Sequence, residues 1–382
     1  MRICLYTDTA LPKMGGQEMV VDALARQYQA LGHDVAVLAP SPRKLSVNDA
    51  AYPYPVARHP RFYSTQYFID WYRRYLLNHF RQRPFDLLHC HGIYPPTYLA
   101  SLLRDEIRVP MVVTSHGGDV YECNVRLQKS TIVERCVQGL RSAAALIAIS
   151  RFTRDGFARL CPEIAPRIVE IPNGVHLANY TERVARPSTC PLDVAPKSYA
   201  VFLGRLKYRK GVDVLLQALA RTPESDRIQL VIIGDGEERA ALEVLAGQLD
   251  LTERVRFLGT VTGPAKTYLL QNARFGVIPS RQWEAFGLVV LEGYASGLPM
   301  LATDMPGLAD LVRPEKTGLL VPPQAPDALA AALHRLLTDD VLINRMSGNA
   351  RHAVSEYDWR NIALRHIALY DSLLARRQRL AA

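Results

Sequence analysis

The feature that most limits the fold is a repeated pattern in which a short apolar run meets a glycine turn that opens a helix. It is clearest at 274–279, a run bounded by proline, which is followed by a helix-like run at 288–295 that stops before Gly297. Residues 2–38 repeat it as strand, glycine turn, helix and strand. Such units build parallel sheets that are covered by helices. We therefore expect an α/β protein with two Rossmann-like parallel-sheet domains.

The chain is long enough for two such domains, because its 382 residues can bury two full cores. Residues 177–198 lack periodicity and contain three prolines, so they read as the linker between the domains. We place the first domain at 1–182, the second at 183–356 and a terminal helix at 357–382.

Composition excludes several classes of protein. No apolar run approaches the ~18 residues of a membrane span, and the first residues look like a strand rather than a secretory signal. Six scattered cysteines without a C-x-x-C pair favour a cytoplasmic protein. The net charge of +9 favours anionic partners, but no nucleic-acid recognition module is present.

His89 and His91 share one face of a predicted strand, yet no acidic or thiol cluster completes a metal site.

Two carboxylates flank the glycine turn after the strand at 274–279. Glu284 and Glu292 are eight positions apart, which corresponds to roughly 10 Å along a turn and helix. At this distance the two carboxylates can bind opposite ends of one ligand. Between them, the backbone amides of Phe286, Gly287 and Leu288 open the helix and favour an anion such as phosphate. The alternative is a solvated loop carboxylate and a salt-bridged helix carboxylate.

The segment Glu-Ala-Phe-Gly-Leu-Val-Val-Leu-Glu, from Glu284 to Glu292, resembles the E-x7-E element of glycosyltransferase family 4, whose members are retaining enzymes of GT-B architecture. Further motifs occur in the family's order along nearly the whole chain: His116-Gly-Gly-Asp, Pro172-Asn-Gly-Val and Gly204-Arg-Leu-x-x-x-Lys-Gly. Lys13-Met-Gly-Gly resembles the K-x-G-G segment of glycogen synthases, but the short chain argues against that role. The chain departs from the family pattern at His176, Pro306 and Asp310.

The resemblance implies a donor-binding role for each matching residue. Glu284 and His116 would contact the sugar, and Glu292 would hold the ribose of the nucleotide. Arg205, Lys210, the amide of Gly16 and the amides at 286–288 would bind the diphosphate, and Val261 would meet the nucleobase. A sugar diphosphate carries about two negative charges, which one arginine and one lysine can balance without a metal. Lys207 and Arg209, in the same turn, are expected to be solvated.

The implied reaction moves a hexosyl group from a nucleotide diphosphate sugar to a hydroxyl of a lipid, saccharide or small metabolite, in a cleft between the domains. UDP is the family's most frequent nucleotide, and neither a metal nor another cofactor is expected. Two alternatives remain open: a nucleotide-sugar epimerase of the same fold and a non-catalytic sugar-nucleotide binder.

Residues 61–83 are the most unusual stretch, with five arginines, one aspartate and eight aromatic residues. A basic aromatic helix can lie on an anionic membrane surface, such as the inner face of the cytoplasmic membrane. An ordinary surface helix that packs its aromatic side chains inward would have the same composition.

Overall fold

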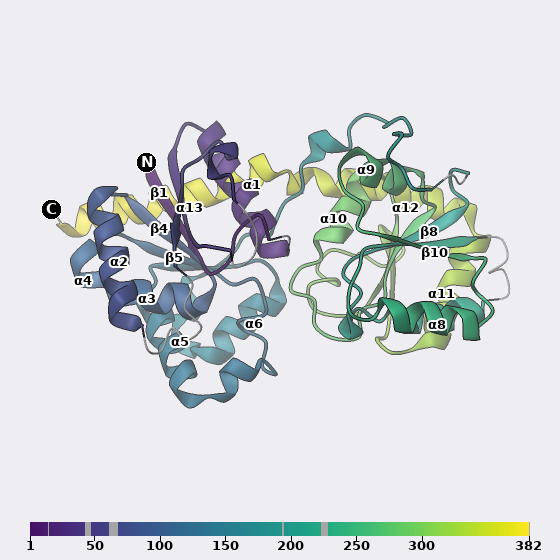
Figure 1. The fold of residues 1–382 in the computed structure, drawn as a ribbon, viewed down its shortest axis with the longest axis horizontal. Coiled ribbons are helices and arrows are strands. Elements are labelled where there is room, and N and C mark those ends of the chain that lie inside the picture. The colour runs from purple at the N-terminus through teal and green to yellow at the C-terminus, as the bar shows by residue number, and fades with distance from the viewer. Residues whose placement is uncertain (14, 43–46, 61–67, 193–194, 223–227, 382) are drawn as a thin grey trace. The chain divides into compact units, whose positions relative to one another are not determined.

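The computed structural model describes residues 1–13, 15–42, 47–60, 68–192, 195–222 and 228–381. The chain forms two compact units (Figure 1). Unit 1 contains Met1–Asn173 and Trp359–Ala382, and unit 2 contains Gly174–Asp358. Residues 174–182 go with unit 2, since the N–H of Val175 bonds the carbonyl of Tyr357 at 2.8 Å.

Unit 1 is built on a parallel sheet of seven strands within the described residues, in the order β3-β2-β1-β4-β5-β6-β7. Its strands are β1 (Arg2–Thr7), β2 (Asp34–Pro40), β3 (Val56–His59), β4 (Leu87–His91), β5 (Met111–Thr114), β6 (Ala145–Ala148) and β7 (Ile168–Glu170). The order reverses direction at β1 and β4, where Tyr6 lies beside Cys90. Ligands of open parallel sheets bind at the carboxyl ends of the strands near such a reversal.

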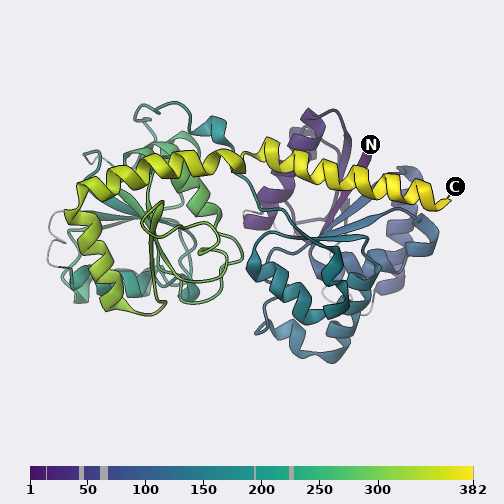
Figure 2. The same cartoon turned by 180° about the vertical axis from the view of Figure 1, so that it is seen from behind.

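Helices cover both faces of this sheet. They are α1 (Gly16–Ala30), α2 (Ile69–Gln82), α3 (Tyr98–Ser101), α4 (Arg104–Ile107), α5 (Ser130–Ser142), α6 (Arg151–Leu160) and α13 (Trp359–Ala381). Helices α2, α3, α5 and α6 share one apolar cluster with side chains such as Cys4 and Cys90. Helices α1 and α13 pack against each other (Figure 2).

A buried polar network joins α1, α13 and β4. The hydroxyl of Tyr28 lies 2.6 Å from Nδ1 of His366 and 2.9 Å from the hydroxyl of Tyr370, which lies 2.6 Å from Nδ1 of His89. Nε2 of His89 reaches the hydroxyl of Thr114 at 2.8 Å. All five side chains are buried, so each bond is strengthened by the low local dielectric. The network fixes the terminal helix on the sheet by polar as well as apolar contacts.

Unit 1 is expected to lose stability as the pH falls. Burial lowers the pKa of His366 to about 3 and that of His116 to about 4, and it lowers the pKa values of His89 and His91 well below the usual range. Below about pH 6.5 these histidines become protonated in the unfolded chain but stay neutral in the folded unit. The free energy of unfolding therefore falls by about 1.4 kcal/mol per pH unit for each such histidine. Hydrogen exchange of α13 and β4 peptides between pH 7 and 4.5 measures this slope.

The variant His366→Asn should make that slope shallower, because an amide takes the place of one titrating ring. The matched control is His352→Gln, a change at an exposed histidine of unit 2. Equal slopes in the wild type and His366→Asn would contradict the expectation.

Unit 2 repeats the architecture with a parallel sheet of six strands among the described residues, in the order β10-β9-β8-β11-β12-β13. The strands are β8 (Tyr199–Leu203), β9 (Gln229–Ile233), β10 (Val255–Gly259), β11 (Phe275–Ile278), β12 (Met300–Thr303) and β13 (Gly318–Val321). The helices are α7 (Val212–Ala220), α8 (Arg239–Gln248), α9 (Gly263–Asn272), α10 (Leu288–Ala295), α11 (Pro326–Thr338) and α12 (Asp340–Ala353).

The expected fold class is confirmed, because both units are parallel α/β sheets covered by helices. The expected strand at 274–279 is β11, and the expected helix at 288–295 is α10. Both short runs are apolar and are bounded by proline or glycine, and such boundaries are the strongest local signals in a sequence.

Candidate functional site

Glu284 lies in the loop between β11 and α10 and is 7% exposed. Its Oε1 atom accepts three hydrogen bonds, from Lys210 Nζ at 2.5 Å, from the hydroxyl of Ser280 at 2.6 Å and from Arg209 Nη1 at 3.4 Å. Within the described residues, Oε2 makes none. One oxygen thus anchors the side chain, while the other remains available to a ligand.

The charge of Glu284 is set by opposing effects. Burial alone would raise its pKa, but the positive charges of Lys210 and Arg209 outweigh burial and lower it. The side chain is therefore a carboxylate near neutral pH. Its contribution to stability is present above the usual pKa of about 4.3 and is lost as the pH falls below it.

Arg209 corrects an expectation from the sequence, which placed it in solvent. Its guanidinium lies over the ring of Trp283, 4.7 Å from the centroid, and donates to the carbonyl of Trp283 at 3.1 Å. The basic turn folds onto the 280–284 loop, so Arg209 is held there by a cation–π contact and by Glu284. Lys207 is more exposed and lies 3.7 Å from Glu237.

Two glycines let separate loops approach Glu284 closely. Gly211 has φ +65°, and a Cβ atom there would lie 2.1 Å from the carbonyl oxygen of Pro279. Gly307 has φ +92°, and a Cβ atom there would lie 2.3 Å from the carbonyl oxygen of Glu284. A side chain at either position would push the loops apart, so glycine is what brings Lys210 within reach of Glu284.

The remaining predicted residues of unit 2 lie at the carboxyl ends of its strands, where parallel sheets hold ligands. Arg205 follows β8 and is exposed, and Val261 follows β10 and is partly buried. Gly287, with φ +101°, is the N-cap of α10, so the first amides of the helix lie beside Phe286 and Leu288. Glu292 is on the next turn of α10.

Glu292 is paired with a residue that the sequence analysis missed. Lys266 of α9 lies 2.6 Å from Oε1 of Glu292, and both side chains are 24% exposed. Ser280 and Lys266 belong to none of the sequence motifs named above, and Arg209 is at a variable position of one of them. Their positions become apparent only when the loops of unit 2 are folded together.

In unit 1, His116 follows β5 and is partly buried. Its Nε2 atom lies 3.0 Å from Nδ1 of His91, at the end of β4. Asp119 accepts from the hydroxyl of Ser115 at 2.5 Å and from the amide of Ile93 at 2.8 Å. Asp119 therefore holds the loop in place, and within the described part of the chain no hydrogen bond joins it to His116.

Gly16 is the first residue of α1 and is exposed. The same helix end already holds a carboxylate, because the buried Glu18 accepts from the hydroxyl of Thr9 at 2.5 Å and pairs with Lys13 at 3.1 Å. Gln17 bridges Asp8 at 2.9 Å and the carbonyl of His91 at 3.2 Å. The helix end thus joins the loops after β1 and β4.

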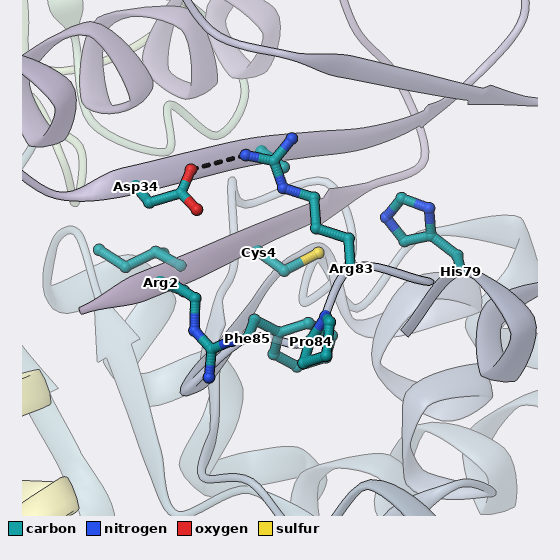
Figure 3. A pocket seen from close by; sticks show the side chains of 9 residues that line it. Arg2, Cys4, Asp34, His79, Arg83, Pro84 and Phe85 are labelled. Carbon is teal, nitrogen blue, oxygen red and sulfur yellow. Dashed lines mark hydrogen bonds and ion pairs between the residues drawn. The ribbon is translucent and has the colours of Figure 1, made fainter. Parts of the chain in front are cut away.

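No group of three or more side chains suited to a metal ion occurs in the part of the chain that the structure describes. A small hollow in unit 1 lies at the amino ends of β1 and β2, beside Cys4, His79 and the Arg83–Asp34 ion pair of 2.6 Å (Figure 3). The hollow is at the amino ends of the strands, whereas His116 is at the carboxyl ends, and it has room for about one water molecule.

The basic aromatic stretch is described from residue 68 onward, and residues 61–67 lie outside the described part. Helix α2 buries Tyr72, Leu76 and Phe80 against the sheet, as the surface-helix interpretation expects. Arg74 and Arg81 are exposed on the same helix. Across the described ranges, no helix combines the length and the apolar character needed to span a membrane.

Two family models together match most of the chain. The model described as Glycosyltransferase Family 4 matches residues 14–179, and the model described as Glycosyl transferases group 1 matches residues 193–353. In the structure the first match covers most of unit 1 and ends a few residues into unit 2, and the second match lies within unit 2.

Individual relatives agree with these models. The chain is 30% identical to phosphatidyl-myo-inositol mannosyltransferase of Mycobacterium leprae, over 98% of this chain and 97% of the relative. It is 30% identical to D-inositol 3-phosphate glycosyltransferase of Jonesia denitrificans, over 75% and 72%. Its fold is similar to that of Anabaena HepE, solved in complex with UDP, with a TM-score of 0.84, 21% identity and coverage of 97% and 100%. The chain belongs to glycosyltransferase family 4 and is a glycosyltransferase of the GT-B fold.

Proposed function

We propose that the enzyme transfers a hexosyl group from a UDP-sugar to a hydroxyl acceptor, with retention at the anomeric carbon and without a metal ion. The observation that carries the proposal is Glu284, a buried carboxylate whose Oε1 atom is anchored by Lys210 and Ser280 while Oε2 makes no hydrogen bond to a described residue. A fixed carboxylate oxygen is suited to orienting the hydroxyls of a sugar.

In this proposal the charges at the carboxyl ends of the unit 2 strands bind the nucleotide. Lys210 and Arg205 balance the diphosphate, together with the first amides of α10 and the amide of Gly16. Glu292 holds the ribose, and Val261 contacts the base. Lys266 neutralises Glu292 at 2.6 Å and so limits repulsion between that carboxylate and the phosphates.

No protein nucleophile is required by this mechanism. The acceptor attacks from the face that the diphosphate leaves, and a departing phosphate oxygen takes the acceptor's proton. The bond from the anomeric carbon to that phosphate oxygen breaks, and the bond to the acceptor oxygen forms. The protein contributes mainly position and charge, with Glu284 and His116 orienting the sugar.

A mass-spectrometric screen of UDP-, GDP- and ADP-sugars against the purified enzyme tests the donor. UDP is proposed because it is the most frequent nucleotide in the family. Products should be separated into transferred sugar, free sugar and epimerised nucleotide sugar. Exclusive epimerisation, or binding without turnover in the presence of acceptors, would contradict the proposal.

Activity is expected to survive EDTA, because Arg205 and Lys210 supply the two positive charges that a magnesium ion would otherwise provide. The measurement compares initial rates in EDTA and in added Mg²⁺ at constant ionic strength. Loss of activity in EDTA with recovery by Mg²⁺ would show that a metal is needed.

For the acceptor, we propose an inositol-containing molecule. The support is that two relatives at 30% identity are named for phosphatidyl-myo-inositol and for D-inositol 3-phosphate. Assays with inositol, inositol phosphates and phosphatidylinositol vesicles distinguish a soluble acceptor from a lipid.

If the acceptor is a lipid, α2 is the proposed membrane contact. Arg73 pairs with Glu106 and Arg83 with Asp34, whereas Arg74 and Arg81 form no ion pair with a described residue. Each basic residue near an anionic surface contributes about 1 kcal/mol. The double variant Arg74→Gln/Arg81→Gln should therefore lower binding to anionic vesicles by roughly thirtyfold in liposome flotation at low salt.

The matched control is Arg73→Gln/Arg83→Gln, which removes the same charge from paired positions. Binding should be weak on neutral vesicles and at high salt, since the attraction is screened. A wild-type protein that stays unbound on anionic vesicles at low salt would rule out this contact.

A further inference from the structure

Unit 1 contains a histidine that the roles above leave unused. His91 ends β4 and is fully buried. Its ring stacks on that of His116 with centroids 5.3 Å apart and planes 20° apart, and its Nδ1 lies 3.0 Å from Nε2 of His116. The ring of His89 also packs against it, 4.2 Å between centroids. His91 is thus held in one orientation beside the residue that is proposed to contact the sugar.

A single proton lies between the two rings. Burial lowers the pKa values of both His91 and His116, so both are neutral near pH 7 and each carries one N–H. In one arrangement His91 donates from Nδ1, and His116 then carries its own proton on Nδ1. In the other, His116 donates from Nε2, and His91 then carries its proton on Nε2.

The surroundings of His91 distinguish these arrangements. Its Nε2 atom is buried and has no hydrogen-bond partner among the described residues. The neighbouring His89 cannot serve, because both of its ring nitrogens are engaged, with Thr114 at 2.8 Å and Tyr370 at 2.6 Å. The second arrangement would bury an unpaired N–H, whereas the first leaves only an unfilled acceptor, which proteins tolerate more often.

We propose that His91 is a positioning residue that donates its Nδ1–H to Nε2 of His116 and thereby fixes His116 as the Nδ1–H tautomer. His116 then presents a hydrogen-bond donor to a hydroxyl oxygen of the substrate. Consistently, Nδ1 of His116 makes no hydrogen bond to any described residue, and the side chain is partly exposed. The substrate-facing part rests on the proposed function, in which His116 orients the sugar.

The tautomer is measured directly by long-range proton–nitrogen NMR of the full chain labelled with ¹⁵N-histidine. The ten histidines are assigned with single variants. The expected spectrum at pH 7 shows His116 protonated on Nδ1 and unprotonated on Nε2. A wild-type His116 protonated on Nε2 would overturn the inference, whatever the activity.

Kinetics of two variants test the consequence. His91→Asn keeps an N–H close to the position of Nδ1, so it should retain kcat/KM within about threefold and preserve the tautomer of His116. His91→Leu removes the donor and should lower kcat/KM by about tenfold or more, as happens when partners that orient metal-bound histidines are lost. Affinity for UDP should stay unchanged in both, because the residues proposed to hold the nucleotide's phosphates, ribose and base are, except for Gly16, in unit 2.

Thermal melting separates this role from a structural one. A fall in activity of His91→Asn equal to that of His91→Leu, or one that tracks the loss of folded protein, would overturn the inference. His116→Ala tests the proposed function separately. If that variant keeps full activity, His116 does not orient the sugar and the substrate-facing part is wrong, while the wild-type spectrum still decides the tautomer.

Discussion

Glu284→Ala is expected to lower kcat by about a hundredfold or more, while the protein remains folded. The physical reason is that Oε1 is anchored by Lys210 at 2.5 Å and by Ser280 at 2.6 Å, so Oε2 has a fixed position for a sugar hydroxyl. Losing one preorganised electrostatic contact typically costs 10²–10³ in rate. Rates are to be measured with saturating donor, and folding by circular dichroism and thermal melting.

Two controls sharpen this result. Glu284→Gln keeps the shape but loses the charge that pairs with Lys210, so its rate should fall between those of the wild type and Glu284→Ala. Glu243→Ala removes an exposed carboxylate of α8, paired with Arg239 at 2.9 Å, and should leave the rate unchanged. More than about a tenth of wild-type activity in a normally melting Glu284→Ala protein would refute the role.

Lys210→Ala is expected to weaken UDP binding by about ten- to a hundredfold and uridine binding by less than about threefold. A charge-assisted hydrogen bond contributes about 1.5–3 kcal/mol, and uridine lacks the phosphates that receive it. The lysine is held in place, because its side chain is 16% exposed and bonds Glu284. Isothermal titration with UDP and with uridine measures both affinities.

Lys207→Ala is the matched control, since it removes the same charge from the same turn. Lys207 is more exposed and lies 3.7 Å from Glu237, so its loss should change UDP affinity by less than about threefold. Lys210→Arg should recover part of the affinity. If Lys210→Ala lost equal affinity for UDP and for uridine, the result would indicate damage to the fold of unit 2 rather than loss of a phosphate contact.

Most of the fold could be predicted from the sequence because its signals are local. The apolar run at 274–279 contains the strand β11, and the run at 288–295 is the helix α10. Each is a short apolar segment between glycine, proline or polar turns. The order of the strands within the sheets is a property of the folded chain.

The chemistry around Glu284 was predictable only in part. The sequence indicated the carboxylate and Lys210 as separate contacts to one ligand, but the fold pairs them directly and adds Arg209, which the sequence placed in solvent. These residues are about 75 positions apart. Their contact depends on the close approach that Gly211 allows, which no local spacing reveals.

The sequence by itself determined the α/β class, the two sheets and the segments that carry charge, because periodicity and glycine turns act over a few residues. The tertiary structure decided which charges meet. It paired Lys266 with Glu292, placed His91 against His116, and joined Tyr28 to Tyr370 across 342 positions. Long-range contacts of this kind depend on how the helices pack on a sheet. Only the folded chain brings these side chains together in a buried environment, where their hydrogen bonds are strengthened.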